Sequence, residues 1–152
     1  MTISSIAFED ISETDLTEII TAGVPEGALI DYKRDMYGNT DADVKEFLKD
    51  VSSFANTYGG HLIVGVDEAA GIPTRMAALS GDPDQDLQRL ENLARDGIEP
   101  RIAGLRMKSV SINTGRLCNR FANSQKLESS APRKRTKHKS SLWSQFGWRL
   151  RV

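Results

Sequence analysis

The stretch SFANTYGGHLIVGV, residues 53–66, decides the fold, because it ends a helix and begins a strand within a few residues. Apolar residues recur at steps of three and four in the preceding segment, which predicts a helix over 41–57. Gly59 and Gly60 then supply a tight turn, since glycine adopts a positive φ at little cost. The apolar run 61–66 predicts a strand buried in the middle of a sheet.

The segments on both sides of this stretch predict a mixed α/β sheet flanked by helices. Apolar periodicity and capping residues predict helices near 13–22 and 83–96. Alternation of polar and apolar residues predicts a strand over 28–34 with one polar face. A further strand is expected at 105–112, and the Asn-Thr-Gly turn at 113–115 predicts a return strand after it.

Composition narrows the class of protein. The chain has 152 residues, which suits one domain, and its 39% apolar and 27% charged residues are typical of a soluble globular protein. No apolar run is long enough for a transmembrane helix, and the N-terminus does not resemble a secretory signal. The single cysteine, Cys118, excludes an internal disulfide. We therefore expect a cytoplasmic protein of prokaryotic type with no membrane partner.

The charge is divided unevenly along the chain. Residues 1–117 contain 20 acidic and 11 basic residues, a net charge of −9, whereas residues 118–152 contain one acidic and nine basic residues, a net charge of +8. A uniform fold rarely separates its charges in this way. The basic segment is therefore either an arm that binds nucleic acid or not the natural end of this protein.

Three carboxylates stand out as candidate catalytic and metal-binding residues. Glu26 precedes the predicted strand 28–34, Asp31 and Lys33 share its polar face, and Asp67 ends the central strand, where α/β sites usually lie. If the two strands are neighbours, the carboxylates converge. Oxygen ligands of this kind suit Mg²⁺ or Mn²⁺, which can activate water against a phosphodiester while Lys33 neutralises the phosphate. The alternative is a solvated acidic face in which Asp31 and Lys33 form an ion pair.

The corner formed by Asn56, Gly59 and Gly60 is a candidate cofactor-binding site. The end of a helix and a tight turn explain these residue types, because asparagine and glycine readily adopt the backbone conformations found there. Alternatively, exposed amides of the two glycines face a phosphate, as in a nucleotide-binding protein. The chain has no P-loop lysine motif, which argues against ordinary ATP hydrolysis. His61 follows this corner. It is interpreted either as a structural histidine or as a general base.

Three motifs, in this order and spacing, resemble one known family. They are EGALIDYKR at 26–34, SFANTYGG at 53–60 and LIVGVDE at 62–68. Together they resemble the Schlafen AlbA-type domain, also described as a DNA-binding or divergent AAA-4 domain, over about residues 12–117. The resemblance implies a Schlafen AlbA-like α/β fold.

The resemblance also implies a set of functions. In animal Schlafen relatives the three matching carboxylates are proposed to form a metal-dependent ribonuclease site that acts on structured RNA such as tRNA. Motif position carries these roles to Glu26, Asp31 and Asp67, although many relatives have the longer Glu where Asp31 stands. Bacterial relatives are described instead as DNA-binding, transcription-regulating or ATP-binding proteins. We expect a module that binds DNA or RNA, with metal-dependent RNA cleavage and nucleotide binding as alternatives.

The basic segment departs from the family. Relatives usually continue with an Ile-x-Val-Pro-x-Ser-Trp strand and a later Arg-Asn-Ser-Ala-Gly-x-Tyr-Glu segment, and neither occurs in 118–152. Codons allowed by this segment, read one nucleotide later from Cys118, can encode both. This predicts a frameshift after Leu117, an incomplete domain over 12–117, a disordered tail, and a strand 105–112 that lacks its hairpin partner. The alternative is a natural tail, with RKRTKHK at 133–139 bound to a nucleic-acid backbone.

Overall fold

The computed structural model describes residues 3–56, 59–113, 115–122 and 149–150. Its helices are α1 (Glu13–Thr21), α2 (Asp41–Ala55) and α3 (Pro83–Gly97), preceded by the short 3-10 turns η1 (Ile3–Ser5) and η2 (Phe8–Asp10). Its strands are β1 (Ile30–Lys33), β2 (Gly60–Val64), β3 (Val66–Ala69), β4 (Ile72–Met76), β5 (Ile98–Glu99), β6 (Leu105–Ile112), β7 (Gly115–Ala122) and β8 (Arg149–Leu150).

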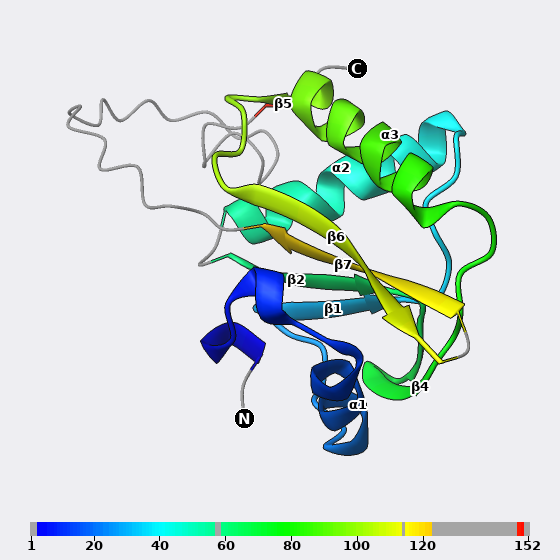
Figure 1. Ribbon diagram of the computed structural model, residues 1–152. Coiled ribbons are helices and arrows are strands. Elements are labelled where there is room, and N and C mark those ends of the chain that lie inside the picture. The colour runs from blue at the N-terminus through cyan, green and yellow to red at the C-terminus, as the bar shows by residue number, and fades with distance from the viewer. Residues whose placement is uncertain (1–2, 57–58, 114, 123–148, 151–152) are drawn as a thin grey trace, which may run out of the picture.

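A four-stranded mixed sheet forms the centre of the fold (Figure 1). Its strand order is β1-β2-β7-β6, in which β1 runs parallel to β2 and the other neighbours are antiparallel. Two small antiparallel pairs, β3–β4 and β5–β8, lie outside this sheet. The predicted α/β class, the mixed sheet and the neighbouring positions of the first two strands are therefore confirmed.

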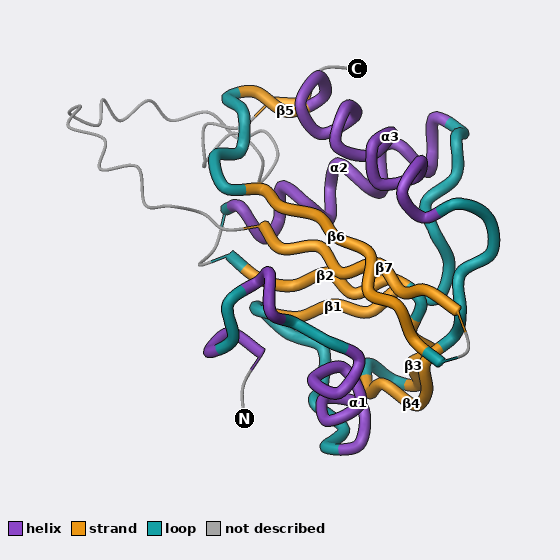
Figure 2. The backbone as a smooth tube through the Cα atoms, viewed as in Figure 1, coloured by secondary structure: helices purple, strands orange, loops and turns teal. Residues whose placement is uncertain are grey.

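Helices cover both faces of the sheet (Figure 2). One hydrophobic cluster joins the sheet to α2 and α3 and includes Phe47, Leu62 and Leu90, while the other joins it to α1 and includes Leu16 and Ile63. Because neighbouring residues of a strand point to opposite faces, β2 supplies side chains to both clusters. This explains why β2 is buried along its whole length, as a strand covered on both faces should be.

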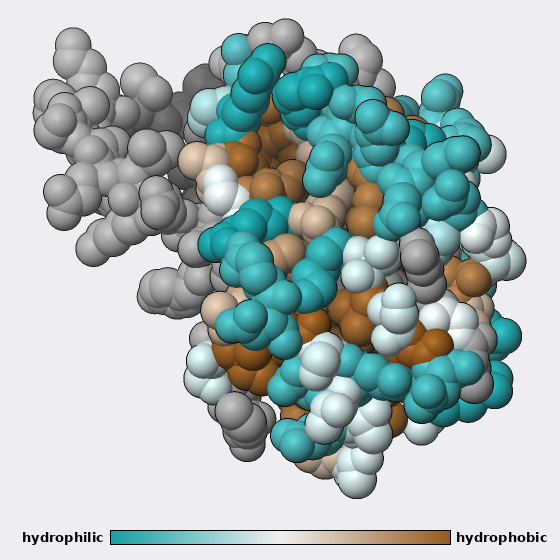
Figure 3. All heavy atoms as spheres, viewed as in Figure 1, coloured by the Kyte–Doolittle hydropathy of each residue, from teal (hydrophilic) through white to brown (hydrophobic). Residues whose placement is uncertain are grey.

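The three long helices begin where the sequence predicts. Ser12 and Thr40 each exchange hydrogen bonds with an aspartate three residues later in a capping box, and the Asp82 carboxylate accepts N–H bonds at the start of α3. Figure 3 shows hydrophilic side chains over α3 and hydrophobic side chains between that helix and β6, as expected of amphipathic helices. Among the described residues, no helix has the length and apolar character to cross a membrane.

The expected strand over 61–66 is interrupted at Gly65, which differs from the prediction. Gly65 has a φ of +95°, so the chain bends away from the central sheet after β2. The Gly65 N–H donates to the Lys33 carbonyl at 2.7 Å, and its own carbonyl accepts from Ala77 N–H at 2.7 Å. Asp67 consequently lies in the hairpin strand β3, not at the end of the central strand, and the hairpin is fastened to the end of β1.

The return strand β7 corrects the expectation that β6 lacks a hairpin partner. It pairs with β6 from Gly115 onward and with β2 on its other side, so it lies inside the sheet. Residues 118–122 therefore belong to the fold, because their backbone completes two ladders of hydrogen bonds. Of the rest of the predicted tail, Arg149 and Leu150 form β8, and residues 123–148 and 151–152 lie outside the described residues. The frameshift and the domain boundary stay predictions that the nucleotide sequence can test.

Candidate functional site

Glu26 and Asp31 form a pair of interacting carboxyl groups at the start of β1. The Tyr32 N–H donates to Glu26 Oε1 at 3.1 Å, and the Glu26 N–H donates to the Gly71 carbonyl at 2.7 Å. Burial of Asp31 and its hydrogen bond with Glu26 raise the pKa of Asp31 to about 6, against the opposing charge of Lys33. Two of the three carboxylates predicted from the sequence are thus brought together.

Lys33 is surrounded by carboxylates. Its Nζ lies 3.3 Å from Glu46 Oε1, 3.5 Å from Asp50 Oδ2 and 3.9 Å from Asp31 Oδ2. Burial alone would lower the pKa of Lys33, but the charges of Asp50, Asp31 and Glu46 raise it. The ammonium group is therefore charged and already neutralised by the protein, which disfavours its predicted contact with a phosphate.

Asp50 was not singled out by the sequence, yet it belongs to this acidic site. It lies on α2, and its Oδ2 accepts the Tyr37 hydroxyl at 2.6 Å. A pocket of about 270 Å³ is lined by Asp50 together with Glu26, Asp31 and Ser53, among other residues. A carboxylate on the polar face of a helix carries no distinctive sequence signal, because most exposed helix faces are charged.

Asp67 points to a different set of partners. Its Oδ1 lies 3.2 Å from Arg34 Nη1 and its Oδ2 lies 2.6 Å from Arg75 Nε. Within the described ranges, no group of three or more histidine, cysteine, aspartate or glutamate side chains is arranged to hold a metal ion. The residues therefore do not fit the expected three-carboxylate Mg²⁺ or Mn²⁺ site, because the third carboxylate is engaged by two arginines.

The glycine corner is explained by the backbone. Gly59 has a φ of +83° and donates its N–H to the Phe54 carbonyl at 3.2 Å, which closes the end of α2. A Cβ at Gly60 would lie 2.3 Å from Phe54 Cδ1 and 2.9 Å from the Leu29 carbonyl oxygen. Both glycines are buried. The positive φ accounts for Gly59, and close packing accounts for Gly60.

Two polar residues adjoin this corner. Asn56 caps α2, with its N–H donated to the Ser52 carbonyl at 3.0 Å. Its side-chain oxygen is buried and has no hydrogen-bond partner among the described residues. His61 is only 2% exposed within β2, a burial that fits the structural interpretation of this histidine better than the catalytic one.

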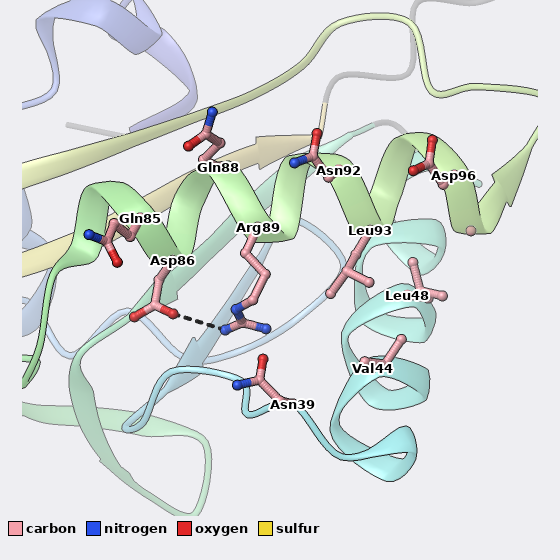
Figure 4. A pocket seen from close by; sticks show the side chains of 11 residues that line it. Asn39, Val44, Leu48, Gln85, Asp86, Gln88, Arg89, Asn92, Leu93 and Asp96 are labelled. Atoms are coloured by element: carbon pink, nitrogen blue, oxygen red, sulfur yellow. Dashed lines mark hydrogen bonds and ion pairs between the residues drawn. The ribbon is translucent and has the colours of Figure 1, made fainter.

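A larger pocket of about 950 Å³ lies between α2 and α3 (Figure 4). Leu48 and Leu93 line its apolar side, and Arg89 crosses its other end. The Arg89 guanidinium donates to the Tyr37 carbonyl at 2.6 Å and to the Gly38 carbonyl at 3.0 Å, and it is ion-paired with Asp86 at 3.0 Å. These contacts tie α3 to the loop before α2, so they explain Arg89 as a structural residue.

The fold is similar to that of solved proteins. One is the solution NMR structure of the N-terminal domain of a RecG-related protein, named for an ATP-dependent DNA helicase, from Nitrosomonas europaea. It is 24% identical, with a TM-score of 0.57, over 86% of this chain and 90% of that chain. The DIP2311 protein from Corynebacterium diphtheriae also matches in part, at 18% identity and a TM-score of 0.46, over 72% of this chain and 22% of that chain. No curated protein matches the sequence.

A sequence model of one protein family also matches the chain, and this match identifies the family more directly than the similar structures do. The model described as "Schlafen, AlbA_2" matches residues 26–143, which is most of the sequence. The match begins at Glu26 and includes the three motifs from which the resemblance was drawn. The chain belongs to the Schlafen AlbA_2 family.

Proposed function

We propose that this chain is a nucleic-acid-binding module. Membership of the Schlafen AlbA_2 family supports this function, and the structurally similar N-terminal domain comes from a protein named for a DNA helicase. The observation that carries the proposal is the position of Asp67 between two arginines. A residue expected to hold a catalytic metal instead accompanies exposed positive charge, which favours binding of a polyanion over its hydrolysis.

The distribution of charge determines how such binding would work. Residues 1–117 carry a net charge of −9, so this part of the chain as a whole repels a phosphate backbone. Contact is therefore confined to local groups of arginines, together with the basic segment 118–152, whose net charge is +8. Both contributions weaken as salt concentration rises, because bound phosphates release their counterions.

Fluorescence anisotropy of the full chain with labelled DNA and RNA oligonucleotides tests this function. We expect binding to both single-stranded and duplex probes, with an affinity that falls steeply between low and moderate salt. A variant with the basic residues of 133–139 replaced by Gln measures the contribution of that segment. Absence of binding to every probe at protein concentrations of about 100 μM and low salt would overturn the proposal, since nonspecific binders reach this range.

RNA cleavage is the second candidate, and the contact between Glu26 and Asp31 is the observation that favours it. A carboxyl group whose pKa is raised by burial and by a neighbouring carboxyl group, as that of Asp31 is, is common in acid–base catalysis. We would incubate tRNA with the protein in the presence and absence of Mn²⁺. Cleavage that disappears in Asp31→Asn but persists in Asp10→Asn, an exposed control, would support this candidate. Equal cleavage by both variants would remove it.

A further inference from the structure

The two arginines that flank Asp67 are much more exposed than the carboxylate that joins them. The Asp67 side chain is 14% exposed, whereas those of Arg34 and Arg75 are 61% and 68% exposed. Each arginine contacts a different oxygen of the carboxylate, so one anion holds two cations beside each other. These three side chains together carry one net positive charge, and most of each arginine side chain faces solvent.

The fold, and not chance proximity, brings these residues together. Asp67 and Arg75 are directly opposite each other in the β3–β4 ladder, where cross-strand pairs of opposite charge interact. Arg34 follows the last residue of β1, whose carbonyl accepts the Gly65 N–H. Because Gly65 also fastens the chain just after β4, the end of β1 and the hairpin are held side by side. The group therefore lies at the carboxyl end of the parallel strands, where α/β proteins bind ligands.

The atoms used in these contacts leave others for an incoming anion. Arg75 meets the carboxylate through Nε, so its two terminal nitrogens remain at the exposed end of the side chain. Arg34 uses Nη1, and its Nε lies at the longer distance of 3.9 Å from the exposed Asp35 carboxylate. A planar guanidinium carries paired N–H donors, whose geometry matches the oxygens of a phosphate.

We propose that Arg34 and Arg75, oriented by Asp67, form a clamp for the phosphate groups of a nucleic-acid backbone. This inference rests on the proposed function and names the groups that perform it. Arginine contacts to phosphates position a protein on nucleic acid without reading bases, so the clamp is indifferent to sequence. Asp67 is a positioning residue in this arrangement: it limits the rotamers of both arginines and thereby reduces the entropy lost on binding.

Substitution of the arginines tests the contact itself. In the full chain, Arg34→Gln and Arg75→Gln should each weaken binding about fivefold or more at low salt and each reduce the slope of log affinity against log salt by about 1. Arg75→Lys keeps the charge but loses the planar pair of donors, so its affinity should lie between wild type and Arg75→Gln. The matched control is Arg95→Gln on α3, since Arg95 is also exposed and paired with an aspartate.

Substitution of Asp67 separates a clamp from general electrostatic attraction. Removal of an acidic residue strengthens polyanion binding if only net charge matters. The clamp predicts the opposite: Asp67→Asn should weaken binding about threefold, because the arginines lose their common anchor. Asp35→Asn is the control, since it removes a neighbouring exposed charge and should leave affinity unchanged or slightly higher. Thermal unfolding of each variant verifies that it is folded.

The outcomes distinguish the clamp from the proposed function. If no probe binds the wild-type chain, the proposed function fails and the clamp fails with it. If the wild type binds but Arg34→Gln and Arg75→Gln bind equally well, only the clamp is wrong. If folded Asp67→Asn binds more tightly than wild type, net charge alone explains the binding, and the positioning role of Asp67 is overturned.

Discussion

Asp31 lies on β1 of the central sheet and Asp67 on β3 of the adjoining hairpin; the two were expected in one site, yet their surroundings are opposite. Asp31 is half-buried beside Glu26, and this environment raises its pKa to about 6. Asp67 is more fully covered but is contacted by two guanidinium groups. Burial alone therefore does not determine the role of a carboxylate. The charge of the nearest partners decides whether a carboxyl group retains its proton or holds cations in place.

We expect the largest effect on stability from a substitution at the glycine corner, where α2 turns back into β2. Gly60→Ala places a Cβ against Phe54 and the Leu29 carbonyl, which itself accepts the His61 N–H and sets the register of β1 on β2. We expect a loss of about 2–3 kcal/mol in the free energy of unfolding. Urea denaturation measures it.

Gly27→Ala is the control for this substitution, because no heavy atom lies within 4 Å of a Cβ at Gly27. Its free energy of unfolding should stay within about 0.5 kcal/mol of wild type. Equal stability of Gly60→Ala and Gly27→Ala would show that the corner tolerates a side chain, contrary to the packing described above.

The protonation of Asp31 gives the next largest effect. Because its pKa is raised from 3.8 to about 6 in the folded protein, the folded state retains the proton longer than the unfolded state. The resulting stability is complete below about pH 4 and is lost as the pH rises toward about 6. Asp31→Asn removes this loss. The free energy of unfolding of the variant should therefore exceed that of wild type by about 2 kcal/mol at pH 7.5. Urea denaturation at a series of pH values measures this difference, with Asp10→Asn as the control. If the stability of both variants depends on pH as that of wild type does, the prediction is wrong.

Lys33 offers a smaller and more specific test of the acidic site. The ammonium charge lowers the pKa of Asp31, so Lys33→Met should move the titration midpoint of Asp31 to a higher pH. Carboxyl carbon chemical shifts followed by NMR measure this midpoint. Lys45→Met, on the exposed surface of α2, should leave it unchanged. A midpoint for Asp31 that falls in Lys33→Met would mean that the lysine does not act on this carboxyl group.

The smallest expected effect on stability is at the arginines. Arg34→Gln should change the free energy of unfolding by no more than about 0.5 kcal/mol, because ion pairs of exposed side chains contribute little. Its effect should appear in nucleic-acid affinity instead. Thermal unfolding at low and high salt measures the stability change. A loss above about 1.5 kcal/mol would identify the Asp67 group as a structural support and weaken its interpretation as a binding surface.

Local patterns account for the parts of the fold that could be predicted. The capping residues Ser12, Thr40 and Asp82 mark helix starts because their side chains bond to amides within the next turn. The alternation in β1 placed Asp31 and Lys33 on one face, which the structure confirms. The break at Gly65 was missed, because one glycine in an apolar run is compatible with a continuous strand. Strand β4 was missed with it.

The site depended on contacts that no local pattern contains. Asp50 and Glu46 reach Lys33 from α2, and the Glu26 main chain meets the turn of the β3–β4 hairpin at Gly71. These groups are distant in sequence and become neighbours only when the elements pack. Motif position grouped Glu26 with Asp31, and the two interact in the structure because only a short loop separates them. It could not assign Asp67, whose partners depend on where the hairpin folds.

The amino-acid sequence alone determined the family, the helices, the two-sided burial of β2 and the polar face of β1, because each depends on residues close together in the chain. Tertiary structure alone decided that Asp67 faces Arg34 and Arg75 while Asp31 faces Glu26. The physical reason is that Coulomb and hydrogen-bond interactions act over a few ångströms of space. A carboxylate acquires its chemistry only once folding has selected its neighbours.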